Sequence, residues 1–157
     1  MKQKSILVII ILILLVTLSC NLPVAAGTEK MKKVHLTTTG TRVAYSGDYS
    51  CQGQDKVDIY IDENGIVSII TRGPRYVDYI NCEQDPDFPE DTFTIDGIAD
   101  PDIQEMTLTS CNSGGLNGDG RVSYKDDKPE GMITCLWTKG VDANKVAMRL
   151  YIPSMGD

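Results

Sequence analysis

Apolar and polar residues alternate with a period of two through much of the chain after residue 33, and this pattern restricts the fold more than any other feature. Val57, Ile59 and Ile61, for example, are separated by Asp58 and Tyr60. Strict alternation places the apolar side chains on one face of a strand, whereas an amphipathic helix repeats every 3.6 residues. This region has no helical stripe, so the sequence predicts an all-β domain.

Turn residues separate the alternating segments and predict where the chain reverses. Glu63, Asn64 and Gly65 lie between residues 57–61 and 66–71, and Asn-Gly suits the positive φ angles of a tight hairpin turn. Further strands are predicted at residues 76–81, 92–95, 106–110, 121–124, 132–138 and 146–152.

The number and spacing of these segments indicate the architecture. About eight or nine short strands with turn residues between them are typical of a sandwich or a closed barrel. The sequence therefore predicts one domain at residues 33–157. An antiparallel β-sandwich is the favoured arrangement, and a small β-barrel is the alternative.

The first residues have the features of an export signal and are set aside from the fold. Lys2 and Lys4 precede an aliphatic run at residues 6–18, in which Thr17 is the only polar residue. A helix of that length spans about 20 Å, which is short for a hydrocarbon core of about 30 Å. We therefore expect a signal peptide at residues 1–19 and a tether at residues 20–32. An uncleaved signal anchor over residues 5–26 is the alternative.

The end of this segment, Leu18-Ser19-Cys20, resembles the lipobox of bacterial lipoproteins. The resemblance covers only the signal, and Thr17 stands where that family has leucine. It implies that Cys20 becomes the lipid-bearing first residue of a membrane-anchored envelope protein. Val24, Ala25 and Ala26 offer ordinary signal peptidase a competing site, and cleavage after Ala26 would release a secreted protein.

Four further cysteines, none close to another in the sequence, remain in the exported part: Cys51, Cys82, Cys111 and Cys135. An even number in an oxidising compartment predicts two disulfides. Zinc sites usually contain closely spaced pairs such as C-x-x-C, so this spacing disfavours zinc. Of three possible connectivities we favour Cys51–Cys82 and Cys111–Cys135, because each pair brackets neighbouring strands. Each closed loop would stabilise the fold by about 3–4 kcal/mol in the chain-entropy model.

The charge of the exported part disfavours nucleic acid as a partner. The chain has 15 Lys and Arg against 22 Asp and Glu, and loss of Lys2 and Lys4 changes its net charge from −7 to −9. Phosphate backbones are bound by clustered Lys and Arg. The only basic cluster, Lys30, Lys32 and Lys33, lies at the end of the tether.

Motifs for nucleophilic catalysis are missing from the sequence. A Ser-His-Asp triad would have to use His35, the only histidine, and no G-x-S-x-G elbow is present. Carboxylates are plentiful, so a small hydrolase that uses two of them across a cleft is one alternative function.

One acidic segment has the oxygen ligands that calcium prefers. It contains Glu83, Asp85, Asp87, Glu90 and Asp91, and calcium takes six to eight oxygen ligands. A solvated connector stiffened by proline is the alternative explanation. Residues 117–120 resemble the middle of an EF-hand loop, but the predicted flanks are strands and the first ligand position is glycine. No other metal or cofactor is predicted.

The aromatic residues are the remaining candidates for contact with a partner. Tyr60 and Tyr151 alternate with inward residues, so they are predicted to face outward, where aromatic side chains can hold a protein or a glycan. Ala147 shares the outward parity of Tyr151. Trp137 shares the parity of Cys135 and is predicted to pack in the core.

Together these features lead to a hypothesis of an exported, lipid-anchored envelope domain that binds a partner or has a structural role, and is not an enzyme. A small secreted hydrolase with paired carboxylates is one alternative. A secreted inhibitor or ligand carrier is another, and a barrel with an apolar cavity would support the carrier.

Overall fold

A computed structural model of the chain describes residues 30–112 and 115–153. The chain divides into two units, Met1–Lys30 and Met31–Asp157, and the second unit contains every strand described below. The predicted signal peptide, Cys20 and the Ala26 cleavage site lie outside the described residues.

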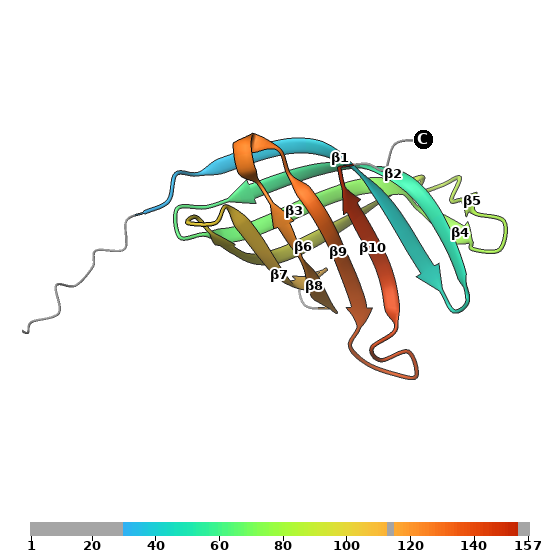
Figure 1. Cartoon of the computed structure of the whole chain (residues 1–157). Helices are drawn as coiled ribbons and strands as arrows, with labels where there is room; N and C mark the ends of the chain where they lie inside the picture. The colour runs from blue at the N-terminus through green and yellow to red at the C-terminus, as the bar shows by residue number, and fades with distance from the viewer. Residues whose placement is uncertain (1–29, 113–114, 154–157) are drawn as a thin grey trace, which may run out of the picture. The chain divides into compact units, whose positions relative to one another are not determined.

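The second unit consists almost entirely of antiparallel strands (Figure 1). The strands are β1 (Val34–Ser46), β2 (Tyr49–Ile61), β3 (Ile66–Pro74), β4 (Tyr76–Asp78), β5 (Glu83–Gln84), β6 (Glu90–Asp100), β7 (Glu105–Cys111), β8 (Leu116–Ser123), β9 (Glu130–Trp137) and β10 (Val146–Ile152). A 3₁₀ turn at Lys125–Asp127 is the only helical element among the described residues. No helix in this part of the chain is long and apolar enough to cross a membrane.

Eight of these strands form a closed barrel in the order β1-β2-β3-β6-β7-β8-β9-β10, and β10 pairs with β1. The prediction of an all-β domain is confirmed, and the chain adopts the barrel alternative instead of the favoured sandwich. β1 pairs with β2 from Val34 to Ser46, and its Thr41–Ala44 segment also pairs with β10. This second pairing uses the backbone groups that an edge strand would leave exposed.

The inward side chains fill most of the barrel. The largest fully buried ones are aliphatic: Val57, Ile59, Ile61, Val67, Ile69, Ile95, Met106, Leu108, Val122, Ile133, Met148 and Leu150. They include Val57, Ile59 and Ile61, whose alternation predicts an inward face, because only every second residue of a strand points inward. The middle of the barrel is therefore a packed core.

The predicted hairpin at Asn64-Gly65 joins β2 to β3. Gly65 has a φ of +79°, a conformation that glycine adopts without strain. The carboxylate of Asp62 accepts hydrogen bonds from the backbone N–H groups of Asn64 and Ile66, each at 2.8 Å. The turn therefore fixes the register that places Ile61 opposite Val67.

Both predicted disulfides are present. Cys51 on β2 is bonded to Cys82, which precedes β5, and Cys111 on β7 is bonded to Cys135 on β9. The Cα atoms of Cys111 and Cys135 are 6.1 Å apart although β8 lies between their strands. Gly118 on β8 lets the β7 backbone pack closely next to this disulfide, because a Cβ there would lie 2.8 Å from the backbone nitrogen of Ser110.

The predicted strand at residues 76–81 is only partly correct. β4 ends at Asp78, and the chain then turns into the two-residue strand β5. The β4–β5 hairpin is inserted between the barrel strands β3 and β6. It lies at the same barrel end as the β1–β2, β7–β8 and β9–β10 connections, which we call the open end (Figure 1).

Candidate functional site

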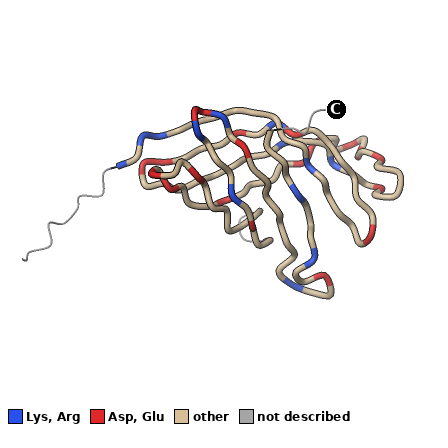
Figure 2. The backbone as a smooth tube through the Cα atoms, in the orientation of Figure 1, with Lys and Arg blue, Asp and Glu red and all other residues tan. Residues whose placement is uncertain are grey.

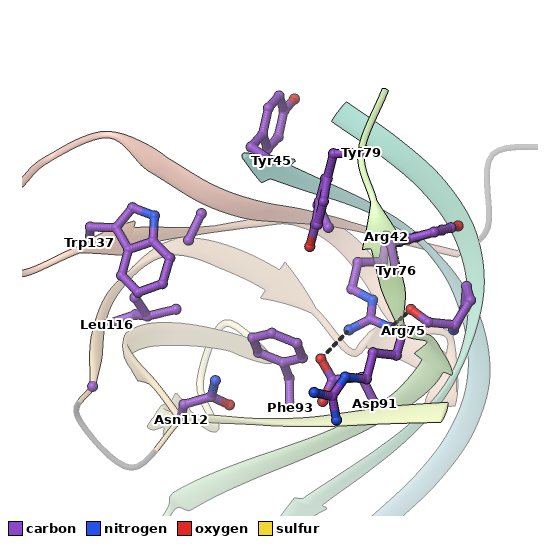
Figure 3. A pocket seen from close by; sticks show the side chains of 14 residues that line it. Arg42, Tyr45, Arg75, Tyr76, Tyr79, Asp91, Phe93, Asn112, Leu116 and Trp137 are labelled. Atoms are coloured by element: carbon purple, nitrogen blue, oxygen red, sulfur yellow. Dashed lines mark hydrogen bonds and ion pairs between the residues drawn. The ribbon is translucent and has the colours of Figure 1, made fainter. Parts of the chain in front are cut away.

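A cavity of about 310 Å³ lies at the open end of the barrel (Figure 3). Its walls come from β1, the β4–β5 insertion, β6, the start of β8, the end of β9 and the start of β10. Five aromatic side chains line it: Tyr45, Tyr76, Tyr79, Phe93 and Trp137. Aliphatic side chains fill the rest of the barrel, so this cavity is an aromatic pocket above a packed core.

Small residues keep the cavity open. Ala44 on β1 and Ala147 on β10 both line it, in places where larger side chains would fill the space. The predicted outward direction of Ala147 is wrong. The pairing of β10 with β9 shifts register between Val146 and Met148, and this bulge brings Ala147 against the core.

Trp137 also differs from its prediction. Its parity predicted core packing, but it is the last residue of β9, and 44% of its surface is exposed. The strand ends at the rim of the barrel, where few atoms remain to cover an indole. Figure 3 shows Trp137 beside the cavity, on the side opposite Tyr79.

A buried ion pair lies at the floor of the cavity, where its arginine, Arg42, is part of the lining. The side chains of Arg42 and Asp55 are 3% and 0% exposed, and Arg42 Nε lies 3.2 Å from Asp55 Oδ2. The hydroxyl of Thr71 donates a hydrogen bond to the same carboxylate oxygen. Arg42 Nη2 donates to the carbonyl of Pro74 at 2.8 Å, and the guanidinium lies 5.1 Å from the centre of the Phe93 ring. Arg42 is therefore held in place from three sides.

The other oxygen of Asp55 is crowded by the opposite strand. Asp55 Oδ1 is buried and has no hydrogen-bond partner among the described residues. A Cβ at Gly73 on β3 would clash with this oxygen. Glycine at position 73 is therefore required for the carboxylate to enter the barrel beside Arg42.

Burial raises the pKa of the Asp55 carboxyl above its usual value of 3.8, against the opposing effects of Thr71 and Arg42. A raised pKa in the folded state means that the folded protein binds this proton more tightly than the unfolded chain. The stability that Asp55 contributes is thus fully present below pH 3.8 and is lost as the pH rises through the raised value.

We expect this pH dependence of stability to be absent from the variant Asp55→Asn. The free energy of unfolding of the wild type minus that of the variant should fall as the pH rises from about 3.8, measured by urea unfolding. Asp58→Asn is the matched control with the opposite sign. Hydrogen bonds from Thr37 and Arg72, both 2.9 Å long, lower the pKa of Asp58, so its contribution is lost as the pH falls below 3.8. If the difference in free energy of unfolding between wild type and Asp55→Asn stayed constant or rose with pH, the pKa of Asp55 would not be raised by folding.

The β4–β5 insertion supplies one wall of the cavity. Tyr76 and Tyr79 meet edge to face with their ring centres 6.1 Å apart. The Tyr76 hydroxyl donates to the carbonyl of Gln52 at 2.7 Å. The Cys51–Cys82 disulfide ties the insertion to β2. This bond therefore holds the aromatic wall in place over the barrel end.

The acidic residues proposed for calcium have separate roles in the structure. Asp85 accepts hydrogen bonds from the backbone of Asp87 and Phe88 and lies 3.4 Å from Arg75. Asp91 lies in the cavity beside Arg42. Glu83 and Glu90 are exposed on strands. Among the described residues, no three acidic, histidine or cysteine side chains form a group that could hold a metal ion. Residues 117–120 lie within strand β8, so they do not form an EF-hand-like loop.

Tyr60 and Tyr151 both lie away from the cavity. Tyr60 is 40% exposed and stacks on His35 at 4.4 Å between ring centres. Its partner on β1 is His35, whereas Tyr151 pairs with Thr41, six positions further along the same strand. The structure does not bring these tyrosines together into one contact surface.

Charged residues are distributed over the whole barrel. Figure 2 shows Lys and Arg interspersed with Asp and Glu along the strands and loops. Comparisons with family models, with curated proteins and with solved structures find no match for this chain. The cavity at the open end is therefore the observation from which a function can be argued.

Proposed function

We propose that the protein binds a small molecule in the cavity at the open end of its barrel. Ligand pockets in proteins usually measure about 300–1,000 Å³ and combine apolar walls with a few fixed polar groups. The cavity measures about 310 Å³ and has aromatic walls above the buried Arg42–Asp55 pair. This combination supports the proposal.

The packed core below the cavity limits what can enter. Ile59, Ile69 and Leu150 are among the fully buried side chains of the barrel interior, so a long chain-like ligand has no channel to follow. The proposed ligand therefore occupies only the open end. This arrangement favours a binding protein with a shallow site over a carrier that encloses its ligand.

Hydrolysis by paired carboxylates has less support than binding. Asp55 and Asp91 are the two carboxylates near the cavity floor, and both face Arg42. Asp55 is fully buried and bonded to Thr71 and Arg42, so its carboxyl group is not positioned to exchange a proton with a substrate.

The proposed site of action is outside the cytoplasm. Two disulfides in a small domain are typical of an oxidising compartment. A lipid on Cys20 would hold the domain at the envelope membrane, and cleavage after Ala26 would release it. In either form the open-end cavity would meet ligands that are present outside the cell or in its envelope.

The proposal predicts that a larger side chain inside the cavity abolishes binding. The full chain would be heated with neutral, anionic and cationic small molecules at millimolar concentration, because a ligand of the native state raises the melting temperature. We expect compounds of at least one class to raise it for the wild type, and Ala147→Phe to lose this rise. Phenylalanine at position 147 would occupy cavity volume.

Ala143→Phe is the matched control, because Ala143 is exposed on the β9–β10 loop and does not line the cavity. It should keep the response of the wild type. Far-ultraviolet circular dichroism would verify the fold of each variant. No stabilising compound in any class, or an equal response of Ala147→Phe and wild type, would overturn the proposal.

A further inference from the structure

The polar groups at the cavity floor leave one donor and one acceptor facing each other without a direct hydrogen bond. Arg42 Nε and Nη2 are used by Asp55 and by the carbonyl of Pro74. Arg42 Nη1 lies 3.8 Å from Asp91 Oδ2, which is longer than a hydrogen bond. In Figure 3 this pair lies beside Phe93 at the edge of the open space.

A hydroxyl group matches this gap. It can accept a hydrogen bond from Arg42 Nη1 and donate one to Asp91 Oδ2, because a hydroxyl is both donor and acceptor. The charged residues of the lining are Arg42, Arg75 and Asp91. Asp55 and Asp85 already pair with the two arginines, so an anionic group would meet the carboxylate of Asp91 and a cationic group would meet the two guanidinium groups. The floor is therefore suited to an uncharged ligand that carries hydroxyl groups.

The walls present flat apolar surface next to this polar gap. Trp137 is partly exposed at the rim, and Tyr79 faces it across the cavity (Figure 3). Aromatic side chains offer large rigid faces for stacking. A molecule that has an apolar ring face and a hydroxylated edge would contact both the indole and the floor.

We propose that the ligand is a neutral saccharide whose ring packs against Trp137 and whose hydroxyl bridges Arg42 and Asp91. This inference rests on the proposed binding function and names the class of ligand for the same cavity. The inference needs both the Trp137 face at the rim and the space between Arg42 and Asp91 at the floor. Neither feature alone distinguishes a sugar from other compounds.

Trp137 allows a direct test, since it is the single tryptophan of the chain. The full chain would be titrated with glucose, galactose, N-acetylglucosamine and maltose while its tryptophan fluorescence is recorded. Benzoate and choline would serve as anionic and cationic probes, and a glycan array would extend the neutral set. We expect a saturable change with a neutral sugar and none with benzoate or choline.

Asp91→Ala should weaken this binding at least about tenfold, because it removes a hydrogen bond to a charged group. Glu90→Ala is the matched control. Glu90 is the exposed neighbour of Asp91 on β6 and does not line the cavity, so its loss should leave sugar affinity unchanged. Circular dichroism would confirm that both variants fold.

The outcomes separate the two proposals. Binding of benzoate or choline without binding of any neutral sugar would overturn the saccharide inference and leave the binding function intact. Equal sugar affinity of Asp91→Ala and Glu90→Ala would place the sugar elsewhere and would also overturn the inference. Loss of the binding function itself would appear as the absence of any stabilising compound in the melting experiment.

Discussion

Replacement of Arg42 by methionine is expected to lower the free energy of unfolding by about 3–5 kcal/mol at neutral pH, because it leaves a buried charge without its partner. Arg42 is nearly inaccessible, and its Nε lies 3.2 Å from the fully buried Asp55. Methionine keeps much of the apolar length of the side chain, so packing changes little. The loss should be smaller near pH 4, where the unpaired Asp55 can take up a proton.

Arg75→Met is the matched control. Arg75 pairs with Asp85 at 3.4 Å but is 52% exposed, and exposed pairs contribute about 0–1 kcal/mol. The double variant Arg42→Met with Asp55→Leu removes both charges, and it should be more stable than Arg42→Met alone. Urea unfolding at pH 7 measures all of these free energies. Equal losses for Arg42→Met and Arg75→Met would show that the buried pair has no special importance.

The elements of the fold could be predicted because they depend on neighbouring residues. Val57, Ile59 and Ile61 alternate with polar residues, and this period is retained in any sheet that buries one face. Gly65 specifies its turn through its own positive φ angle. The two disulfides followed from the same argument, since each joins segments close in strand order. These features required no knowledge of distant contacts.

The closure of the barrel could not be predicted in this way. It depends on the pairing of Thr41 with Tyr151, residues from opposite ends of the domain. A sandwich and a barrel both alternate inward and outward residues along each strand. The period alone therefore gives no reason to prefer one architecture, and the sandwich preference had no physical signal to support it.

The candidate site escaped prediction for a local reason. The alternation places Ala147 on the outer face, because it does not show the bulge between Val146 and Met148. The alternation also places Trp137 in the core, because parity does not show where a strand leaves the barrel. Arg42 and Ala44 are both buried on β1, a strand that the alternation of apolar and polar residues does not predict. A buried arginine requires a buried partner, but the sequence does not identify Asp55 as that partner among its 22 acidic residues.

We expect loss of the Cys111–Cys135 bond to lower stability more, and loss of the Cys51–Cys82 bond to lower ligand affinity more. Replacing Cys111 and Cys135 together with alanine should cost about 3–4 kcal/mol in chain entropy, and more in packing, because both sulfurs are fully buried. Replacing Cys51 and Cys82 removes a loop constraint of similar length, but Cys82 is exposed. Replacement of Cys111 and Cys135 should therefore lower the free energy of unfolding by about 1–2 kcal/mol more than replacement of Cys51 and Cys82.

Ligand affinity should fall more when the Cys51–Cys82 bond is removed than when the Cys111–Cys135 bond is removed. The Cys51–Cys82 bond fastens the insertion that carries Tyr76 and Tyr79, so its removal lets this wall of the cavity move away from the barrel. We expect the Cys51→Ala, Cys82→Ala variant to lose more ligand affinity than the variant that lacks Cys111–Cys135, although it loses less stability. Urea unfolding and ligand titration on the same samples would measure both. If the variant that lacks Cys111–Cys135 lost more affinity while both remained folded, the insertion would not form the binding wall. In that case the ligand contacts would lie nearer to β7, β8 and β9, and the placement of the site against Tyr76 and Tyr79 would be wrong.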